Sequence, residues 1–362
     1  MKICFLAPAN NYHTRKWCSW FCERGHEVHV VSFIDDKIDN VIVHFIDTGA
    51  QADSTDSKKL KYLFKVKDVK KIVKQIKPDI VNAHYATSYG TVAALAGLKN
   101  YILSVWGMDI YDFPKKSMFH KMMLKYSLSH ASHIFSTSYA MAIETKKYTK
   151  KHVDITPFGV DMKLFNPDKR KRKINDDKYI IGTIKALTPK YGIEYLIKAV
   201  AFIKNNRPDI PIELRIAGKG EMEKEYKELA IREGIEANTH WLGFISQERC
   251  AAEWANMDVG IVPSVLDSES FGVSAVEAEA CGVPVIISDI PGLMEATFPK
   301  KSSIVVERCN VNELASKIIY FYDNREMRLL FGKEGRKFVE ERYELNNCFR
   351  KIEHLFEEYL DD

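Results

Sequence analysis

Two acidic side chains, eight residues apart, indicate where this chain could do chemistry. Glu269 lies in a polar loop that follows an apolar run at 259–262, and Glu277 lies in a helical pattern that begins at Gly272. This order predicts a strand, a loop and a helix, with Glu269 at the carboxyl end of the strand, where open α/β sheets bind their ligands. The amino terminus of such a helix favours an anion, because its first backbone N–H groups lack partners and its dipole is positive there.

An anion alone does not explain two carboxylates at one place. A carboxylate accepts strong hydrogen bonds from vicinal hydroxyl groups, so the ligand should carry hydroxyls as well as phosphates, as a nucleotide sugar does. Lys185 and Lys190 flank another predicted strand-to-helix loop, and their point charges would suit a diphosphate. Two exposed lysines in a lysine-rich chain are the alternative explanation. Gly218 opens a third such loop, where glycine lets the backbone pass close to a ligand or turn into the helix.

Three polar residues in the first half of the chain occupy similar places. His84 comes directly after the apolar run 79–83, Asp109 follows the run that ends at Gly107, and His13 precedes the first predicted helix. Each could face a ligand at the carboxyl edge of a sheet. The alternatives are, in the same order, a hydrogen-bonded structural histidine, a turn or helix-capping aspartate and an exposed residue near a helix cap.

Other kinds of site are missing from the sequence. The segment that begins at Gly218 has Glu223 where a dinucleotide fingerprint needs its third glycine, and neither a Walker-type phosphate loop nor a serine-hydrolase elbow occurs. No histidines lie three or four residues apart on one predicted helix beside other ligands, so no metal site is expected. The basic segment 169–173 has no interleaved aromatic residue, which argues against a nucleic-acid partner.

The candidate residues lie on an alternation of apolar runs and helical patterns that occurs twice. Seven strand-like runs with helices between them fill the first half, and six more follow a charged segment at 166–173 that is typical of a linker. Such alternation predicts a parallel sheet covered on both faces. We therefore expect an α/β protein with two doubly wound Rossmann-like domains, 1–166 and 167–344, facing each other across a deep cleft. A final helix at 345–362 is expected to pack back on the first domain.

Composition indicates the cellular compartment in which the protein works. The chain has 362 residues, of which 46% are hydrophobic and 28% charged, and no apolar run approaches the length of a transmembrane helix. Seven cysteines, an odd number without a C-x-x-C pair, favour free thiols in a reducing compartment. We expect a cytoplasmic protein, soluble or peripheral. Lysines concentrate in the first half, at 58–77, 115–125, 146–151 and 169–173, either as solvated helix faces or as a surface attracted to anionic lipid.

Over nearly its whole length the sequence resembles glycosyltransferase family 4, the retaining nucleotide-sugar enzymes with the GT-B fold. The most specific part is the segment 269–286, which resembles the E-x7-E signature of that family and contains Glu269 and Glu277. Supporting similarities are the segments 25–28, 157–161, 218–220 and 241–244, together with Lys185 and Lys190. The resemblance implies the GT-B arrangement, with the acceptor bound by the first domain and the donor by the second.

The resemblance also implies a role for each candidate residue. Glu277 would bind the ribose hydroxyls, Glu269 would hold hydroxyls of the donor sugar, and Lys190 with Lys185 would neutralise the departing diphosphate. Further donor contacts would come from the backbone of Phe271, Gly272 and Val273, from the loop at Gly218, from Phe244 beside the base, and from His13 and Thr14 beside the phosphates. Many members of the family carry a histidine where Trp106 stands, next to the reacting sugar, so that Asp109 or His84 would serve as the catalytic orienting residue instead.

The activity implied is transfer of a sugar, with retention of its anomeric configuration, from a nucleotide sugar to a hydroxyl acceptor. A UDP-sugar donor and a lipid-linked or polysaccharide precursor of a surface glycan are expected, with the protein peripheral on the inner face of the plasma membrane. No cofactor and no metal ion are expected, because lysines and a helix terminus would carry the leaving charge. The alternatives are a GT-B nucleotide-sugar epimerase, a phosphorylase and a non-catalytic nucleotide-sugar-binding subunit.

Overall fold

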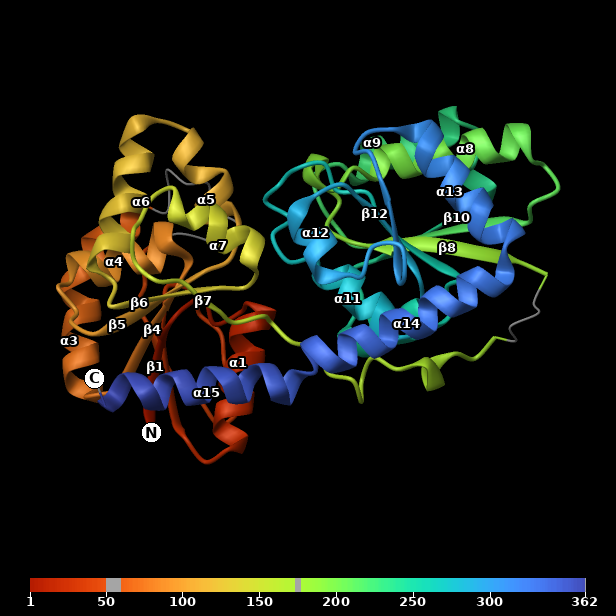
Figure 1. Cartoon of the computed structure of the whole chain (residues 1–362). Coiled ribbons are helices and arrows are strands. Elements are labelled where there is room, and N and C mark those ends of the chain that lie inside the picture. The colour runs from red at the N-terminus through yellow and green to blue at the C-terminus, as the bar shows by residue number, and fades with distance from the viewer. Residues whose placement is uncertain (50–59, 173–176, 362) are drawn as a thin grey trace. The chain divides into compact units, whose positions relative to one another are not determined.

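The computed structural model describes residues 1–49, 60–172 and 177–361. The chain divides into two compact units (Figure 1). Unit 1 comprises Met1–Phe158 and Phe349–Asp362, and unit 2 comprises Gly159–Cys348. Each unit is built around its own parallel β-sheet, and the α/β class expected from the alternating pattern is confirmed for both.

Unit 1 contains a seven-stranded sheet in the order β3-β2-β1-β4-β5-β6-β7. Its strands are β1 (Lys2–Leu6), β2 (Glu27–Ser32), β3 (Ile42–Phe45), β4 (Ile80–His84), β5 (Tyr101–Val105), β6 (His133–Ser136) and β7 (Asp154–Ile155). Every residue of β4 and β5 is buried, as expected for strands covered on both faces. The strand order reverses between β1 and β4, which is where doubly wound sheets bind ligands at their carboxyl edge.

Helices cover both faces of this sheet. They are α1 (Tyr12–Glu23), α3 (Val66–Ile76), α4 (Gly90–Leu95), α5 (Met108–Tyr111), α6 (Met118–His130), α7 (Tyr139–Lys146) and α15 (Leu345–Asp361), with the short helical turns η1 (Leu60–Lys65), η2 (Tyr85–Tyr89) and η3 (Phe113–Lys115). Alternate side chains of a strand point to opposite faces. Cys4 and Leu6 of β1 therefore join the core beneath α3, α4 and α6, whereas Phe5 contacts Trp17 and Phe21 of α1.

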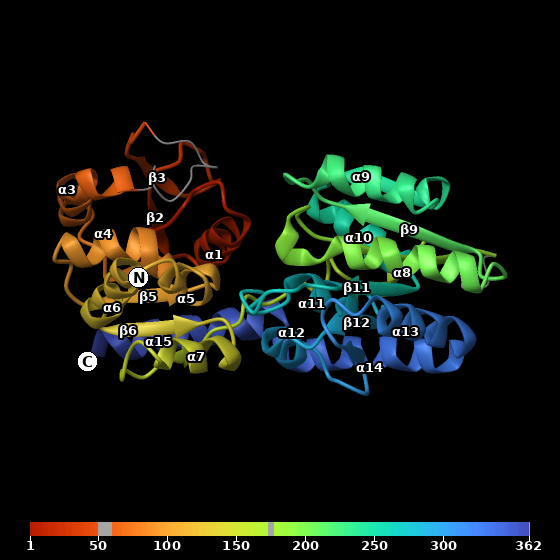
Figure 2. The same ribbon diagram turned by 90° about the horizontal axis from the view of Figure 1, so that it is seen from above.

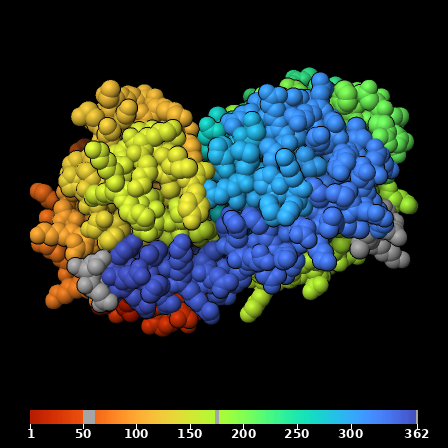
Figure 3. Space-filling model, viewed as in Figure 1, coloured from red at the N-terminus to blue at the C-terminus, as the bar shows by residue number. Residues whose placement is uncertain are grey.

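The last helix, α15, begins in unit 2 and ends in unit 1. Phe349 and Phe356 are completely buried, and the ring of Phe356 stacks on Phe21 at 5.4 Å between centroids. Glu353 accepts a hydrogen bond of 2.9 Å from the Arg24 side chain. The outer residues of α15 form the dark blue band along the lower edge of unit 1 in Figure 3. Burial of these rings explains why the end of the chain belongs to unit 1.

Unit 2 contains a six-stranded sheet in the order β10-β9-β8-β11-β12-β13. Its strands are β8 (Tyr179–Ile184), β9 (Ile212–Ala217), β10 (Thr239–Gly243), β11 (Val259–Val262), β12 (Val285–Ser288) and β13 (Ser303–Val306). All its neighbouring strands pair in parallel. The order again reverses, here between β8 and β11, so the loops that follow these two strands lie at the switch point of unit 2.

The helices of unit 2 also form two layers. They are α8 (Ile193–Asn206), α9 (Glu223–Arg232), α10 (Gln247–Ala255), α11 (Val273–Ala280), α12 (Pro291–Ala296), α13 (Val311–Asp323) and α14 (Arg325–Tyr343), with the 3₁₀ turns η4 (Pro167–Lys169), η5 (Pro189–Tyr191) and η6 (Glu236–Asn238). Helices α8 and α13 lie side by side over one face of the sheet (Figure 2). Helices α11 and α14 pack together on the other face, below the sheet in Figure 1.

The charged segment 166–173, which was expected to be a linker, packs against unit 2 in its described part. Arg170 and Arg172 form ion pairs with Asp258 at 3.2 and 2.6 Å, and the Arg172 and Asp258 side chains are almost completely buried. Residue 173 lies outside the described residues. Since the described part of the segment makes these buried contacts, its charges serve packing within unit 2, and the division between the units falls earlier, after Phe158.

Candidate active site

Three loops meet at the carboxyl edge of the sheet in unit 2, where β8, β9 and β11 end. Glycine makes their close approach possible. A Cβ atom at Gly192, in the loop after β8, would lie 2.1 Å from the Pro263 carbonyl oxygen of the loop after β11. A Cβ atom at Gly218, after β9, would lie 1.8 Å from the carbonyl oxygen of Lys185, and the φ of Gly218 is +140°. Gly218 therefore lets the loops pack closely together, and its predicted contact with the donor stays a prediction.

A buried ion pair joins two of these loops. The Nζ atom of Lys185 lies 2.8 Å from Oε1 of Glu269, and each side chain is less than a tenth exposed. Burial lowers the pKa of Lys185, but the charge and hydrogen bond of Glu269, together with Tyr191 and Glu277, outweigh this effect, so that the pKa lies above its usual value. The structure thus brings together three of the predicted residues as one charged group that is shielded from water.

Lys190 extends this group along the loop after β8. Its ammonium donates a hydrogen bond of 2.9 Å to the carbonyl oxygen of Ser268, the residue before Glu269. The ring of Tyr191 lies beneath both lysines, with its centroid 4.8 Å from Nζ of Lys185 and 5.3 Å from that of Lys190. Tyr191 was not predicted as a site residue, although an aromatic residue directly after Lys190 was a visible signal. Its ring attracts both ammonium groups through cation–π interactions.

Helix α11 begins beside this charged group. Gly272 precedes it in the left-handed region, with φ of +74°, and no side chain caps the first turn. No acidic residue occupies that first turn either, so none of its own side chains opposes the positive end of the helix dipole. Phe271 and Glu277 are buried, and Val273 is the first residue of the helix. The predicted anion site thus has the backbone geometry that such a site needs.

Arg308 was not predicted, yet it holds the loop in front of Glu269. Its guanidinium binds Oδ1 of Asp267 at 2.9 Å and Oδ1 of Asp289 at 3.1 Å, and it donates to the Asp289 carbonyl oxygen at 2.9 Å. On the other side of the loop, a Cβ atom at Gly292 would lie 2.5 Å from the Glu269 carbonyl oxygen. The backbone at position 269 is therefore held from two sides. The role of Arg308 and Gly292 in holding it follows from tertiary contacts and has no signal in the sequence.

Phe244 stands apart from this charged group. It follows β10, directly after Gly243, and its side chain is 78% exposed. The carbonyl oxygen of Gly243 accepts a hydrogen bond of 2.7 Å from the N–H of Gly218, which ties the loop after β10 to the loop after β9. An exposed ring at the end of a strand next to the site can stack on a planar base, and this remains the predicted role of Phe244.

In unit 1, His13 and Thr14 lie at the start of α1. The side-chain oxygen of Asn11 accepts hydrogen bonds from the backbone N–H groups of His13 at 2.8 Å and of Thr14 at 3.2 Å. These two N–H groups therefore have a partner within the chain. The imidazole of His13 stacks on the ring of Phe158 at 3.9 Å, and burial, then Lys16 and His84, hold its pKa well below the usual range. His13 is consequently neutral at physiological pH.

His84 lies inside an aromatic cluster. Its ring centroid is 5.4 Å from that of Phe5, 5.1 Å from Trp17 and 4.2 Å from Trp106, and its Nε2 is 3.0 Å from Oδ1 of Asn82. The side chain is completely buried, and this burial lowers its pKa to about 3. The geometry matches the alternative of a hydrogen-bonded structural histidine. Sequence position alone could not distinguish a strand-end histidine that faces a ligand from one that faces the core.

Asp109 organises two strand-end loops of unit 1. Its Oδ1 accepts hydrogen bonds from the N–H groups of Trp106 at 3.1 Å and Gly107 at 2.9 Å, and its Oδ2 accepts one from Ala86 at 2.9 Å. Burial raises the pKa of Asp109, and these backbone donors partly offset the rise. The arrangement matches the alternative of a turn aspartate. It links the loop after β4 to the loop after β5, and both loops line a cavity.

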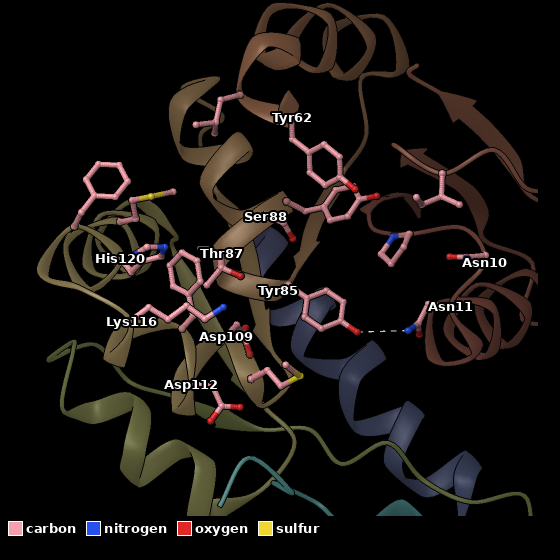
Figure 4. A pocket seen from close by; sticks show the side chains of 18 residues that line it. Asn10, Asn11, Tyr62, Tyr85, Thr87, Ser88, Asp109, Asp112, Lys116 and His120 are labelled. Atoms are coloured by element: carbon pink, nitrogen blue, oxygen red, sulfur yellow. Dashed lines mark hydrogen bonds between the residues drawn. The ribbon is translucent and has the colours of Figure 1, made fainter. Parts of the chain in front are cut away.

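This cavity has a volume of about 660 Å³ and lies within unit 1, at the carboxyl ends of β1, β4 and β5 (Figure 4). Its lining combines tyrosine, phenylalanine and methionine side chains with amides, hydroxyls, carboxylates and the basic side chains of Lys116 and His120. Tyr85 has a left-handed φ of +67°, a costly conformation for a residue other than glycine. This conformation aims its hydroxyl at Asn11, whose amide donates to it at 3.4 Å. The sequence did not reveal this cavity.

Within 1–49, 60–172 and 177–361, no group of three or more His, Cys, Asp or Glu side chains has the geometry to hold a metal ion. None of the helices described in the structure combines the length and apolar character required to cross a bilayer.

Family models assign both halves of the chain. The model described as "Glycosyl transferases group 1" matches residues 165–338 and includes the charged group of unit 2. The model described as "Glycosyl transferase 4-like" matches residues 2–138 in unit 1. The chain belongs to the group 1, family-4-like glycosyltransferases of the GT-B class, and the resemblance seen in the sequence is confirmed.

Individual relatives agree with this assignment. An uncharacterized glycosyltransferase of Methanocaldococcus jannaschii is 26% identical over 92% of this chain and 91% of the relative. A GDP-mannose-dependent monoacylated α-(1-6)-phosphatidylinositol monomannoside mannosyltransferase of Corynebacterium glutamicum is 32% identical, over 51% of this chain and 50% of the relative. The chain thus spans about half the length of some curated relatives that it matches.

Solved structures share the whole fold. Sucrose-phosphate synthase from Thermosynechococcus elongatus superimposes with a TM-score of 0.85 at 19% identity, over 99% of this chain and 98% of the other. The Anabaena protein HepE, solved in complex with UDP-glucose, has a TM-score of 0.78 at 18% identity, over 99% and 100% of the two chains. The expected fold class of two Rossmann-like α/β domains is therefore confirmed.

Proposed function

We propose that this glycosyltransferase moves a sugar from a nucleotide-sugar donor to a hydroxyl acceptor with retention of the anomeric configuration. The observation that carries the proposal is the charged group of unit 2. Lys185, Lys190 and Glu269 lie together at the switch point of the sheet, beside the amino terminus of α11. Positive charge suits a diphosphate, and a carboxylate suits sugar hydroxyls.

The donor would lie along this edge of unit 2. Glu269 would bind hydroxyls of the transferred sugar, Glu277 those of the ribose, and Phe244 would stack on the base. A UDP-sugar is the first donor to test, since HepE binds UDP-glucose, whereas the mannosyltransferase relative depends on GDP-mannose. The ion pair holds Lys185 and Glu269 at fixed positions beside each other, and charged groups that are already in place cost little reorganisation when charge develops during the reaction.

The leaving diphosphate would be stabilised by the chain itself. Lys185, Lys190 and the positive end of α11 would carry its charge, so neither a metal ion nor another cofactor is part of the proposal. As the bond between the sugar and the diphosphate breaks, the acceptor oxygen would bond to the sugar on the face that the diphosphate leaves, and the hydroxyl proton would pass to an oxygen of the departing diphosphate, so that the anomeric configuration is retained. No carboxylate nucleophile is assigned.

The acceptor would bind in the cavity of unit 1. Its aromatic and methionine side chains provide apolar surface, and its amides, hydroxyls and carboxylates provide partners for hydroxyl groups. A lining of this mixed kind fits an amphiphilic acceptor, such as a lipid-linked or polysaccharide precursor of a surface glycan. The volume of about 660 Å³ is sufficient for one or two sugar rings.

A thermal-shift panel of nucleoside diphosphates and their sugars tests the donor site. A ligand that binds only the folded state raises the unfolding temperature by mass action, and we expect one nucleotide and its sugars to do so. The Glu277→Gln variant should lose this shift, whereas the matched control Glu228→Gln, on the exposed surface of α9, should keep it. If no nucleotide changes the unfolding temperature, the proposed donor site is wrong.

Release of the nucleoside diphosphate then identifies the reaction. A transferase releases it much faster when an acceptor is present. An epimerase converts the donor sugar without an acceptor, a phosphorylase needs inorganic phosphate and pyridoxal phosphate, and a non-catalytic subunit binds nucleotide without turnover. Each of these three results would replace the proposed function.

A further inference from the structure

The connection between β4 and α4 has an unusual backbone at the cavity of unit 1. Its first residue, Tyr85, has a left-handed φ of +67°, and η2 forms one turn of π-helix. Strained residues and π-helical turns persist only where the surrounding structure holds them, and they are frequent at functional sites. The conformation of η2 therefore indicates a task in the cavity beyond the joining of a strand to a helix.

Two hydrogen bonds hold η2 in this conformation. The backbone N–H of Ala86 donates to Oδ2 of Asp109 at 2.9 Å. The buried hydroxyl of Tyr89 accepts a hydrogen bond of 3.1 Å from the backbone N–H of Phe33. The two residues between these anchors line the cavity, namely Thr87 and Ser88. Because the anchors come from two other connections of unit 1, both hydroxyl-bearing residues have a fixed backbone.

Three polar side chains of the cavity are available to a ligand. Thr87, Ser88 and Asp112 line the cavity (Figure 4), and each is partly exposed. None of the three side chains forms a hydrogen bond or an ion pair within the part of the chain that the structure describes. Asp109 differs, because backbone N–H groups bind both of its carboxylate oxygens. Thr87, Ser88 and Asp112 can therefore exchange water for a ligand without losing a contact inside the protein.

The charges around the cavity favour a neutral ligand. Lys116 lines the same cavity as Asp112, and its ammonium would repel a cation, whereas the carboxylate of Asp112 would repel an anion. A polyol meets neither repulsion. A carboxylate accepts strong hydrogen bonds from vicinal hydroxyls, and serine and threonine hydroxyls both donate and accept. The polar side chains thus match a molecule that presents several hydroxyl groups.

Aromatic rings add the surface that a sugar ring needs. Tyr62, Tyr85 and Phe113 line the cavity. The ring of Phe113 is held edge-on against His120, with 4.7 Å between the centroids. The C–H face of a pyranose is apolar and packs on aromatic rings, while its hydroxyls reach polar groups at the rim. Phe113 directly follows Asp112, so an aromatic ring and the carboxylate come from adjacent residues.

From this arrangement we infer that Asp112 binds a vicinal diol of a neutral pyranose at the end of the acceptor, and that Thr87 and Ser88 hydrogen-bond the same ring. The three residues select the acceptor, because a sugar that lacks one hydroxyl of the diol leaves an oxygen of Asp112 without its partner. The inference rests on the proposed function in one respect, namely that the cavity of unit 1 binds the acceptor.

NMR titration of the full-length protein with simple glycosides tests the inference. The probes are the methyl glycosides of glucose, mannose, galactose and N-acetylglucosamine, and the monodeoxy analogues of those that bind. At least one glycoside should bind the wild type at millimolar concentration, and removal of one hydroxyl of its diol should weaken binding about tenfold.

The variants locate the diol. Asp112→Asn should bind the parent glycoside about tenfold more weakly, and removal of the same hydroxyl should then cost less than about threefold. Thr87→Val keeps the shape of the side chain but loses its hydroxyl, so it should weaken binding about threefold. The matched control is Asp39→Asn, which changes an exposed carboxylate between β2 and β3 and should leave binding unaltered.

The other results would overturn the inference. Failure of every neutral glycoside to bind, equal behaviour of Asp112→Asn and Asp39→Asn, or an undiminished cost of the missing hydroxyl in Asp112→Asn would each show that Asp112 binds no diol. A methyl glycoside of an amino sugar that binds more tightly than every neutral glycoside, with a preference that Asp112→Asn alone removes, would show that the carboxylate binds an ammonium group.

The thermal shift with nucleoside diphosphates, measured on the same samples, separates this inference from the proposed function. Absence of that shift in the wild type contradicts the proposed function. A retained shift without binding of any neutral glycoside contradicts the diol site alone.

Discussion

The strand-end loops of unit 1 and unit 2 occupy equivalent places on two doubly wound sheets, but they are held together in opposite ways. In unit 2, a buried ion pair between Lys185 and Glu269 and close contacts at glycines fix the loops. In unit 1, the corresponding loops are fixed by aromatic rings around Trp106 and by the backbone hydrogen bonds of Asp109.

The difference in construction leads to a difference in charge. Unit 2 keeps two ammonium groups beside the start of α11, which suits a ligand with a diphosphate. Two histidines near strand ends of unit 1, His13 and His84, are neutral because burial lowers both pKa values. The cavity of unit 1 instead combines aromatic side chains with amides, hydroxyls, carboxylates and two basic side chains, a mixed lining that can hydrogen-bond the hydroxyl groups of a saccharide. The same topology therefore places two differently built sets of residues at its strand ends, which we propose hold the donor and the acceptor.

Removing a positive charge from the charged group of unit 2 should have the largest effect on the reaction rate. We expect Lys190→Ala to lower kcat by about 10²–10³, because loss of one group that stabilises developing charge typically costs this much. Steady-state release of nucleoside diphosphate measures the change. The control is Lys224→Ala, whose side chain is 88% exposed on α9. A kcat within a few-fold of the wild-type value in Lys190→Ala, with normal folding, would remove this lysine from the proposed mechanism.

Adding a side chain at a closely packed glycine of unit 2 should lower the stability of the protein. In Gly218→Ala, the new methyl group would meet the Lys185 carbonyl oxygen, and φ is +140°, so we expect a loss of about 2–4 kcal/mol in the free energy of unfolding. Gly234→Ala is the matched control, because its φ is +68° but nothing lies within 4 Å of the new atom. It should cost only about 1 kcal/mol. Urea unfolding of both variants measures the difference, and equal losses would show that close packing at Gly218 is unimportant.

Much of the proposed donor site could be predicted from the sequence, because its residues directly follow predicted strands. Apolar runs followed by polar loops locate strand ends, where ligands bind, and the resemblance to glycosyltransferase family 4 implied that Lys185, Lys190 and Glu269 hold one donor. Sequence spacing could not show that Lys185 and Glu269 pair directly. It also missed Arg308, whose partners Asp267 and Asp289 lie far away in the chain.

The proposed acceptor site was less predictable, because its residues come from distant parts of the sequence. The cavity of unit 1 is lined by Tyr62, Tyr85 and Phe113, which lie in three different strand-to-strand connections. No short sequence pattern predicts that such distant residues come together. The direction in which a strand-end side chain points is also a tertiary property. His84 turns into the aromatic core, and the charged segment near Arg172 packs against Asp258 where a linker was expected.

The two units should also respond oppositely to pH. Burial lowers the pKa of His84 in unit 1 to about 3, so between pH 6.5 and 3 only the unfolded chain binds this proton, and acid removes stability. Burial raises the pKa of Glu279 in unit 2 to about 8, with a smaller opposing effect of Ser302. Between pH 4.5 and 8 the folded state keeps that proton, so stability falls as pH rises. Each group changes the free energy of unfolding by about 1.4 kcal/mol per pH unit within its window.

Glu279→Gln tests the part of this prediction that concerns unit 2. An amide cannot ionise, so the variant should gain stability relative to the wild type as pH increases from 5 to 8. The control Glu228→Gln changes an exposed carboxylate and should leave the pH profile unaltered. Unfolding in urea at several pH values measures both. Parallel profiles for Glu279→Gln and the wild type would mean that this carboxyl group is already ionised in the folded protein.

The smallest predicted effects are changes in KM, which test whether each unit binds a different substrate. In Tyr85→Phe, the hydroxyl that accepts a hydrogen bond from Asn11 is lost from the wall of the cavity, so KM for the acceptor should rise about 2–10-fold while KM for the donor stays constant. In Tyr191→Leu, the ring beneath Lys185 and Lys190 is lost, so KM for the donor should rise by a similar factor and KM for the acceptor should not. Steady-state kinetics with each substrate varied in turn separates the two constants. If either variant changed both constants equally, the assignment of donor to unit 2 and acceptor to unit 1 would lose its support, because a side chain in one unit would then affect both ligands.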